Sequence, residues 1–128
     1  MKKRRLGKIL LIIVLLLAVT IVGAYLLMNR NLGKLADATI VNVDMGKVTD
    51  GEYFGKYTVL LVNVKVKVIV KDHLIENVLL LRHDNGQGKT SERIVEDVIA
   101  QQRTNVDIIA GATYSSKVIL KAIENAMQ

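Results

Sequence analysis

The chain has 128 residues and a formal net charge of +6, with 51% hydrophobic residues, 4% aromatic residues and neither cysteine nor proline. This length is enough for one domain, and a chain without cysteine has no disulfide framework and no cysteine metal site. All six net charges lie in residues 1–30, because the remaining 12 basic and 12 acidic residues cancel. A nucleic-acid-binding domain needs a clustered basic face, so nucleic-acid binding is not expected of residues 31–128. A transition-metal site is not expected either, in a chain without cysteine.

Residues 1–30 have the pattern of a cytoplasmic basic flank followed by a transmembrane anchor. The uncharged run from Ile9 to Met28 has 20 residues, about the length that an α-helix needs to cross a bilayer core. Five positive charges precede the run, at Lys2, Lys3, Arg4, Arg5 and Lys8. Only Arg30 and Lys34 closely follow it. This asymmetry predicts a single-pass membrane protein with a cytoplasmic N-terminus and an extracytoplasmic domain.

The alternative for this segment is a cleaved signal peptide, with Val22-Gly23-Ala24 as the cleavage site. The apolar region of a signal peptide has about 7–15 residues. The run here is longer, which favours an anchor that stays in the membrane.

Residues 31–49 are predicted to form a juxtamembrane linker and a first strand, because polar and apolar residues alternate from Ala38 to Met45. One long strand is predicted from Tyr57 to Val70, with a bend near Asn63. Its valines share one face and its lysines the other, which is typical of an antiparallel sheet with one buried face. A hairpin turn at residues 71–73 and a returning strand at 74–81 complete the predicted sheet.

Helices are predicted after the strands. A polar loop from His83 to Lys89 precedes a helix that Thr90 or Ser91 caps. The loop segment Gly86-Gln87-Gly88-Lys89 lacks the spacing of a nucleotide-binding loop. Apolar residues recur at helical spacing in two segments, at Ile94, Val95, Val98 and Ile99 and at Val118, Ile119, Ala122, Ile123, Ala126 and Met127. Strands followed by helices indicate an α+β fold, here an antiparallel sheet packed with helices and preceded by one transmembrane helix.

The stretch from Asp107 to Ser116 is predicted to be a turn into the N-terminus of the last helix. Gly111 allows a backbone conformation that other residues avoid, and Ser115 and Ser116 are N-cap residue types. A helix N-terminus has unpaired N–H groups and the positive end of the helix dipole, which favour a bound phosphate. Thr113 has a hydroxyl at this position. From these residues alone, an ordinary N-cap threonine is the simpler interpretation.

This stretch resembles the flavinylation motif of the FMN-binding domain family, which occurs in subunits of sodium- and proton-linked redox pumps and in small extracytoplasmic redox proteins. The family pattern is Asp, two variable residues, Ser or Thr, Gly, Ala, and then Thr or Ser. By this resemblance Asp107 is the leading acid, Gly111 and Ala112 are the small pair, and Thr113 is the threonine that a flavin transferase esterifies with the FMN phosphate. Ala110 departs from the pattern, which bears on the efficiency of transfer. The resemblance covers residues 50–128 as one FMN-binding domain.

The resemblance implies a membrane-anchored flavoprotein that carries electrons through covalent FMN on Thr113. The expected cofactor-binding set adds Tyr114, the aromatic residue best placed to stack on the flavin, together with Ser115 and Ser116. The implied partners are a flavin transferase and membrane or extracytoplasmic redox proteins. No catalytic residues for a separate substrate are evident, which favours an electron carrier or a redox-complex subunit over a stand-alone enzyme. Two alternatives stay open: a non-covalent FMN-binding or sensory domain, and a cofactor-free interaction module at the cell surface.

Overall fold

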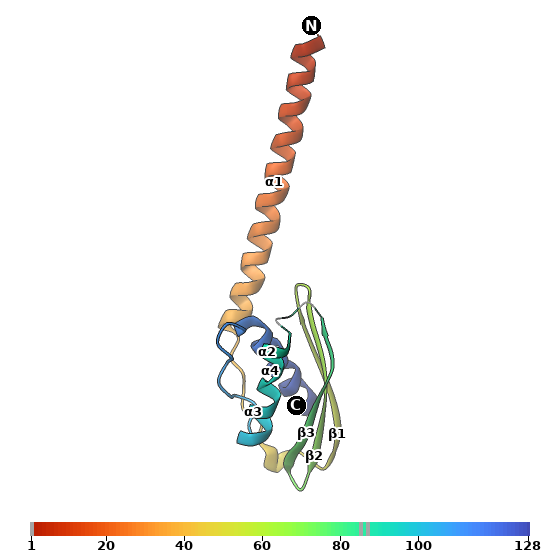
Figure 1. The fold of residues 1–128 in the computed structure, drawn as a ribbon, viewed down its shortest axis with the longest axis vertical. Coiled ribbons are helices and arrows are strands. Elements are labelled where there is room, and N and C mark those ends of the chain that lie inside the picture. The colour runs from red at the N-terminus through yellow and green to blue at the C-terminus, as the bar shows by residue number, and fades with distance from the viewer. Residues whose placement is uncertain (1, 85, 87) are drawn as a thin grey trace.

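The computed structural model of the chain describes residues 2–84, 86 and 88–128. One long helix, α1 (Lys2–Asp37), leads into a small α+β domain (Figure 1). The domain contains a three-stranded sheet, and Figure 1 shows the shorter helices on one of its faces. The predicted α+β class is therefore confirmed. The loop predicted around Gly86 lies partly outside the described residues, because Asn85 and Gln87 are not among them.

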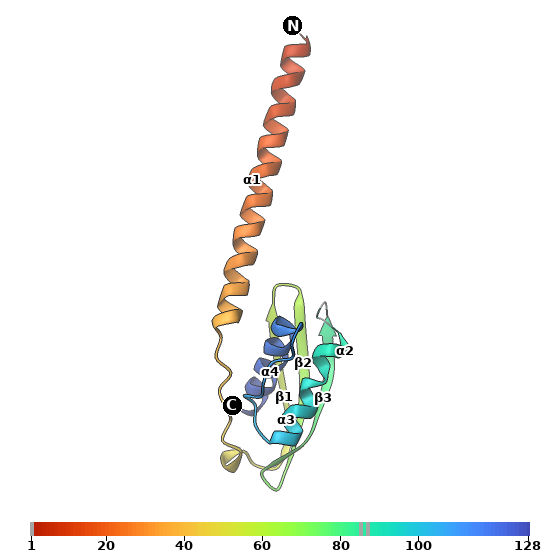
Figure 2. The same ribbon diagram turned by 60° about the vertical axis from the view of Figure 1, so that its left-hand side comes forward.

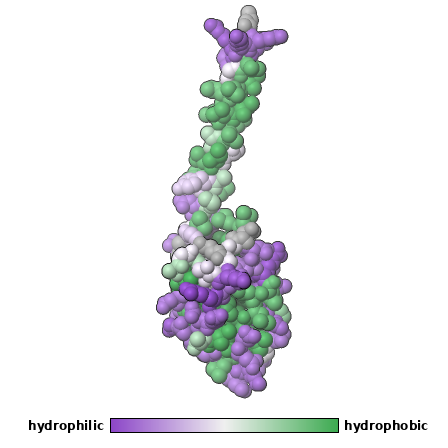
Figure 3. All heavy atoms as spheres, viewed as in Figure 1, coloured by the Kyte–Doolittle hydropathy of each residue, from purple (hydrophilic) through white to green (hydrophobic). Residues whose placement is uncertain are grey.

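The helix α1 has 36 residues and is therefore about 54 Å long. None of its most apolar stretch is buried within the domain. Figure 3 shows this stretch as a continuous hydrophobic band with a hydrophilic N-terminal end. The helix is long and apolar enough to cross a membrane, and its place near the N-terminus also fits a signal sequence.

The sheet is an antiparallel meander of β1 (Gly51–Val59), β2 (Val62–Lys71) and β3 (Leu74–Asp84). The single long strand predicted over residues 57–70 is wrong, because the chain reverses at Leu60 and Leu61. The predicted faces are right: four valines of β2 are at most 2% exposed, at positions 64, 66, 68 and 70. The predicted turn before Leu74 is confirmed.

The turn between β2 and β3 places Asp72 and His73 in the left-handed region, with φ of 51° and 60°. Glycine or asparagine usually occupies such positions. The backbone N–H of His73 donates to the Asp50 carboxylate at 3.3 Å, and the His73 ring bonds to the carbonyl oxygen of Val48 at 2.8 Å. Backbone hydrogen bonds from Asp72 and His73 hold the pKa of Asp50 below its ordinary value of 3.8. The turn is therefore stabilised from a neighbouring segment.

The helix α4 (Thr113–Met127) packs against β1 and β2 and buries its apolar face. Ile119 and Ile123 are fully buried, as the helical spacing predicts. The contact is closest at Gly55 of β1, where an added Cβ would lie 2.0 Å from the carbonyl oxygen of Ala122. Glycine at this position is therefore what lets the strand and the helix approach each other.

The first strand predicted over residues 38–45 does not form. This segment is extended and ends in a short 3-10 helix, η1 (Met45–Lys47). Its backbone is bonded by side chains: Val41 N donates to Glu124 Oε2 at 3.0 Å, and Val43 N donates to Thr104 Oγ1 at 3.1 Å. Ile40, Val43 and Met45 pack against the core while Val41 is 53% exposed, so the packed residues do not follow the alternation. The backbone N–H groups of Val41 and Val43 bond to side chains instead of a neighbouring strand.

The helix predicted after residue 90 forms as two pieces, α2 (Lys89–Glu92) and α3 (Ile94–Gln101). Ser91 is not a cap, because it lies inside α2 and its hydroxyl donates to the carbonyl oxygen of Gly88 at 2.9 Å. Serine makes such a bond to the preceding turn as readily as it caps a helix. Ile94 and Val98 of α3 are fully buried in the core.

Candidate functional site

A tight turn leads into α4. The backbone N–H of Ala112 donates to the carbonyl oxygen of Ile109 at 3.0 Å, which closes a four-residue turn. Gly111 is the third residue of this turn and has a φ of 79°. This is the conformation that a type II turn requires at its third position, where glycine is preferred. The glycine predicted to shape the approach to the helix therefore has a defined conformational role.

Thr113 is the first residue of α4, and its side chain is exposed. The N-cap is Ala112, whose side chain is fully buried and has no group to cap the helix. Within the described part of the chain, Thr113 Oγ1 makes no hydrogen bond. Thr113 is therefore not an N-cap threonine; it presents a hydroxyl at a helix N-terminus that no side chain caps.

Ser115 and Ser116 are buried, with exposed fractions of 1% and 0%. Ser116 Oγ accepts a hydrogen bond from the backbone N–H of Ile109 at 3.3 Å. This bond joins the first turn of α4 to the segment before Gly111. The hydroxyl of Ser116 thus fixes the position of the turn from inside the domain. Both serines lie inside α4, and the N-cap position is taken by Ala112.

The remaining residues of the motif lie on the surface, except Ile109, which is buried. Asp107, Ala110 and Tyr114 are exposed, Tyr114 by 41%. Ile108 is also exposed, by 38%, and was not among the residues predicted for the site. The position of Ile108 next to Asp107 in the motif could have indicated a place in the site, but the sequence analysis did not use it. Two large apolar side chains close in sequence to Thr113 are therefore accessible to a bound molecule.

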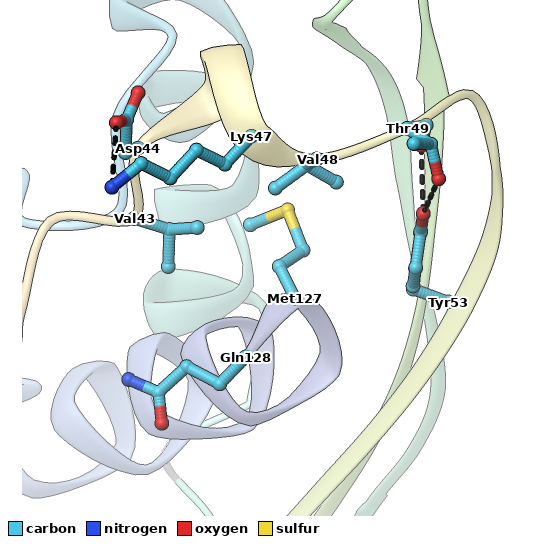
Figure 4. A pocket seen from close by; sticks show the side chains of 8 residues that line it. All are labelled: Val43, Asp44, Lys47, Val48, Thr49, Tyr53, Met127 and Gln128. Atoms are coloured by element: carbon cyan, nitrogen blue, oxygen red, sulfur yellow. Dashed lines mark hydrogen bonds and ion pairs between the residues drawn. The ribbon is translucent and has the colours of Figure 1, made fainter.

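The N-terminus of α4 lies at the end of the domain where α1 joins it. Lys117 Nζ, one turn into α4, donates to the carbonyl oxygen of Leu35 near the end of α1 at 3.3 Å. A cavity of about 360 Å³ lies at the other end of α4, lined by Met127 and Gln128 and by residues of the segment around η1 (Figure 4). Because α4 has 15 residues and is about 22 Å long, this cavity is separate from Thr113.

His83 was expected in a loop but lies on β3, with its side chain 4% exposed. His83 Nδ1 is 3.0 Å from Glu92 Oε1, and Nε2 is buried with no hydrogen-bond partner among the residues that the structure describes. A Cβ added at Gly86 would lie 1.8 Å from Nε2, so the Gly86 backbone covers the ring. Two bulges in the β2–β3 pairing shift the alternation of β3, which explains why the sequence pattern did not show His83 facing inward.

The turn and the helix N-terminus fit the phosphate end of a flavin mononucleotide. A phosphate is stabilised by the free N–H groups and the positive dipole end of a helix. The first turn of α4 contains no acidic residue that would repel it, and an added Cβ at Gly111 meets nothing within 4 Å. The hydroxyl of Thr113 and the space beside Gly111 are thus both accessible.

These features define a small α+β domain with an exposed threonine hydroxyl at the N-terminus of a helix, a position that is favourable for an anion. The model of the FMN-binding domain family matches residues 61–128, more than half of the chain, and the chain therefore belongs to this family. The membership supports FMN as its cofactor. The match includes β2, β3 and the helices α2, α3 and α4, and with them the whole segment around Thr113. A comparison with curated proteins found no match.

Proposed function

We propose that the protein is a membrane-anchored electron carrier whose FMN is attached to Thr113 through a phosphoester bond. The observation that supports it best is the exposed Thr113 hydroxyl at the uncapped N-terminus of α4, in a chain of the FMN-binding domain family. A structural threonine at a helix start would cap the helix or be buried, and Thr113 does neither.

Each residue of the site has a defined part in this proposal. The transferase would take the FMN phosphoryl group from a flavin dinucleotide: the P–O–P bond of the donor breaks, the nucleoside monophosphate leaves and the hydroxyl proton of Thr113 is released. The new O–P bond on Thr113 Oγ1 gives a phosphodiester with one negative charge. A charge at a helix N-terminus is stabilised by about 0.3–1 kcal/mol at an exposed site. Gly111 and Ala112 keep the approach free of bulky side chains, and Ser116 holds the turn in place. Tyr114 and Ile108 offer apolar surface to the flavin ring.

FMN supplies the electron-transfer chemistry when it is bound, and the protein supplies its position and electrostatic surroundings. A covalent tether keeps the cofactor with a domain outside the cytoplasm. In this proposal α1 is an uncleaved transmembrane helix, the domain is extracytoplasmic, and Asp107 is part of what a flavin transferase recognises. The electron donors and acceptors are membrane or extracytoplasmic redox proteins.

The test is to produce Thr113 variants together with a flavin transferase and to measure covalent flavin on a denaturing gel by fluorescence and by intact mass. Thr113→Val keeps the shape of the side chain but removes the hydroxyl, so covalent flavin is expected to be lost while the fold is retained. Thr113→Ser keeps a hydroxyl and is expected to retain flavin. Fluorescence of Thr113→Val equal to that of the unmodified sequence would refute the attachment site.

Two further variants test how the transferase recognises the motif. Asp107→Ala leaves the acceptor hydroxyl in place and is expected to reduce the flavin yield. Ala110→Ser restores the usual family residue at an exposed position and is expected to keep or raise the yield. If no variant carries covalent flavin but the native protein binds FMN that denaturation releases, the non-covalent alternative is correct. A protein that binds no FMN in either form would instead be a cofactor-free module.

A further inference from the structure

The tip of the β1–β2 hairpin has leucines where such turns usually have glycine or asparagine. Leu60 and Leu61 form a two-residue connection between Val59 and Val62 and are 44% and 76% exposed. Leu60 has a φ of 53°, in the left-handed region that is least costly for glycine. Leu60 is therefore an unfavourable choice for the turn itself, and the exposed surface of both leucines indicates contact with something outside the domain.

Three cationic side chains form a row across the outer face of the sheet behind this tip. Lys56 lies opposite Lys65, and Lys65 lies opposite Arg82. All three are exposed and line an open hollow of about 470 Å³. Like charges directly opposite each other destabilise a sheet.

Most of the charge in this row is not neutralised inside the domain. Arg82 forms an ion pair with Asp84. Among the residues that the structure describes, Lys56 and Lys65 form no ion pair. The next lysine along β2, Lys67, is paired with Glu52 at 3.2 Å. The row therefore favours an anionic partner at the tip end of the hairpin.

The tip lies beside the end of α1. Residues from both elements line one cavity of about 250 Å³: Asn31, Lys34 and Leu35 of α1, and Tyr57, Thr58, Val59 and Leu60 of the hairpin. Figures 1 and 2 both show the tip reaching the level of the last turns of α1. The apolar run of α1 ends at Met28, and the helix rises only about 4.5 Å from there to Asn31. The tip is thus at the depth where a membrane-spanning α1 would leave the bilayer.

We propose that the β1–β2 hairpin inserts its tip into the anionic surface of the membrane that α1 crosses. Leu60 and Leu61 enter the boundary between headgroups and acyl chains, while Lys56, Lys65 and Arg82 face the headgroup phosphates. Apolar side chains combined with basic ones are what bind a protein segment to an anionic bilayer surface. The inference rests on the part of the proposed function in which α1 stays in the membrane. It orients the domain with the N-terminus of α4, and so Thr113, toward the bilayer.

A single tryptophan can report this contact, because the chain contains none. Leu61→Trp is placed in the full-length protein, produced without a flavin transferase and reconstituted into vesicles of phosphatidylglycerol and phosphatidylcholine. The tryptophan emission is expected to shift to shorter wavelengths in the presence of these vesicles. The emission is also expected to lose intensity when the acyl chains of the lipids are brominated. The matched control is Leu74→Trp, because Leu74 is 54% exposed and follows the turn at the opposite end of the sheet. The control is expected to keep the emission of a tryptophan in water.

The role of the cations is tested in the Leu61→Trp background. Leu61→Trp alone is expected to be quenched more strongly in anionic vesicles than in vesicles of phosphatidylcholine alone. Adding Lys56→Gln and Lys65→Gln is expected to remove this difference between the two kinds of vesicle. Lys71→Gln, an exposed lysine at the other end of β2, is expected to keep it. Quenching of Leu61→Trp no stronger than that of Leu74→Trp would overturn the membrane contact. Equal lipid preference in the double variant and its parent would overturn the part assigned to the cations.

The intact mass of the reconstituted chain separates a failure of the membrane anchor from a failure of the hairpin contact. A chain that has lost its first residues shows a cleaved signal peptide, and the proposed membrane anchor then fails. A full-length chain with an unquenched tryptophan at position 61 leaves the anchor in place and overturns the hairpin contact alone.

Discussion

At the scale of single residues, Gly55 determines how closely β1 and α4 pack. An added Cβ at this position would lie 2.0 Å from Ala122 O, 2.7 Å from Ala126 N and 2.8 Å from Ala126 Cβ. Two of these atoms belong to the helix backbone and cannot turn aside as a flexible side chain would. Any side chain at position 55 therefore has to push α4 away from the sheet.

Gly55→Ala is expected to lower the free energy of unfolding by at least the ~1–3 kcal/mol typical of overpacked cores. The measurement is urea denaturation of the protein in detergent. The control is Gly33→Ala, because Gly33 lies on the exposed surface of α1 and an added Cβ there meets nothing within 4 Å. Unfolding of Gly55→Ala at the same urea concentration as the unsubstituted protein would contradict the close approach of strand and helix.

Gly111 has a different role from Gly55, although both are single glycines near α4. Nothing lies within 4 Å of an added Cβ at Gly111, but its φ is 79°. A side chain would therefore strain the backbone without colliding with a neighbour. The sequence indicates this conformational role, because a glycine before a helix start is a turn signal. It cannot indicate the steric role of Gly55, which depends on a helix more than 60 residues further along the chain.

At the scale of secondary-structure elements, patterns of local origin were predicted well and patterns set by distant partners were not. The valines of β2 and the isoleucines of α4 lie on the predicted faces, because alternation and helical spacing are properties of one element. The reversal at Leu60 and Leu61 was missed, since leucine carries no turn signal and the four consecutive apolar residues from Val59 to Val62 resemble the interior of one strand. The extended residues 38–44 resemble a strand, but their hydrogen bonds are made to Thr104 and Glu124 from the other end of the chain.

In the candidate site too, features set by the local sequence were predicted and features set by distant packing were not. The turn at Gly111 and the helix that follows it were predicted from local signals, whereas Thr113, Ser115 and Ser116 as N-cap residues were wrong, because all three lie inside α4. Ala112 as the N-cap and the burial of Ser115 and Ser116 were not predicted, because burial depends on how α4 sits on the domain. The inward position of His83 depends on bulges in the pairing with β2. Such bulges leave no signal in the alternation of a single strand.

The docking of α4 gives a prediction at this scale. Ile123 is fully buried beneath the sheet, so Ile123→Asp places an unpaired charge in the core and is expected to destabilise the domain by several kcal/mol. A domain of this size has only about 5–15 kcal/mol of stability, so the variant is expected to melt far below the unsubstituted protein or not to fold. Asn125→Asp is the control, because Asn125 lies on the exposed side of the same helix.

Circular dichroism against temperature measures both variants. Asn125→Asp loses at most the hydrogen bond from Asn125 Nδ2 to the carbonyl oxygen of Lys56, which is worth about 1 kcal/mol. A melting temperature of Ile123→Asp close to that of Asn125→Asp would show that α4 is not docked through Ile123.

At the scale of the whole molecule, α1 and the domain differ in whether their apolar side chains are buried. The domain buries its valines and isoleucines between sheet and helices. The leucines and isoleucines of α1 are exposed by more than half along most of its length. Such a surface is unfavourable in water and favourable in the core of a bilayer. Residues 31–128 contribute no net charge, so in the proposed membrane-anchored protein the basic flank at the N-terminus is the feature expected to determine which side of the membrane the domain occupies.

That flank predicts an extracytoplasmic domain, because positive residues stay on the cytoplasmic side. Protease added to intact spheroplasts is expected to remove the domain from about residue 31 onward and to leave a membrane-bound fragment containing α1. A cytoplasmic protein followed in the same sample serves as the control for intact membranes. Replacing Lys2, Lys3, Arg4, Arg5 and Lys8 by glutamine removes the asymmetry and is expected to increase the protected fraction. Full protection of the unsubstituted chain before lysis, with cleavage only afterwards, would place the domain in the cytoplasm.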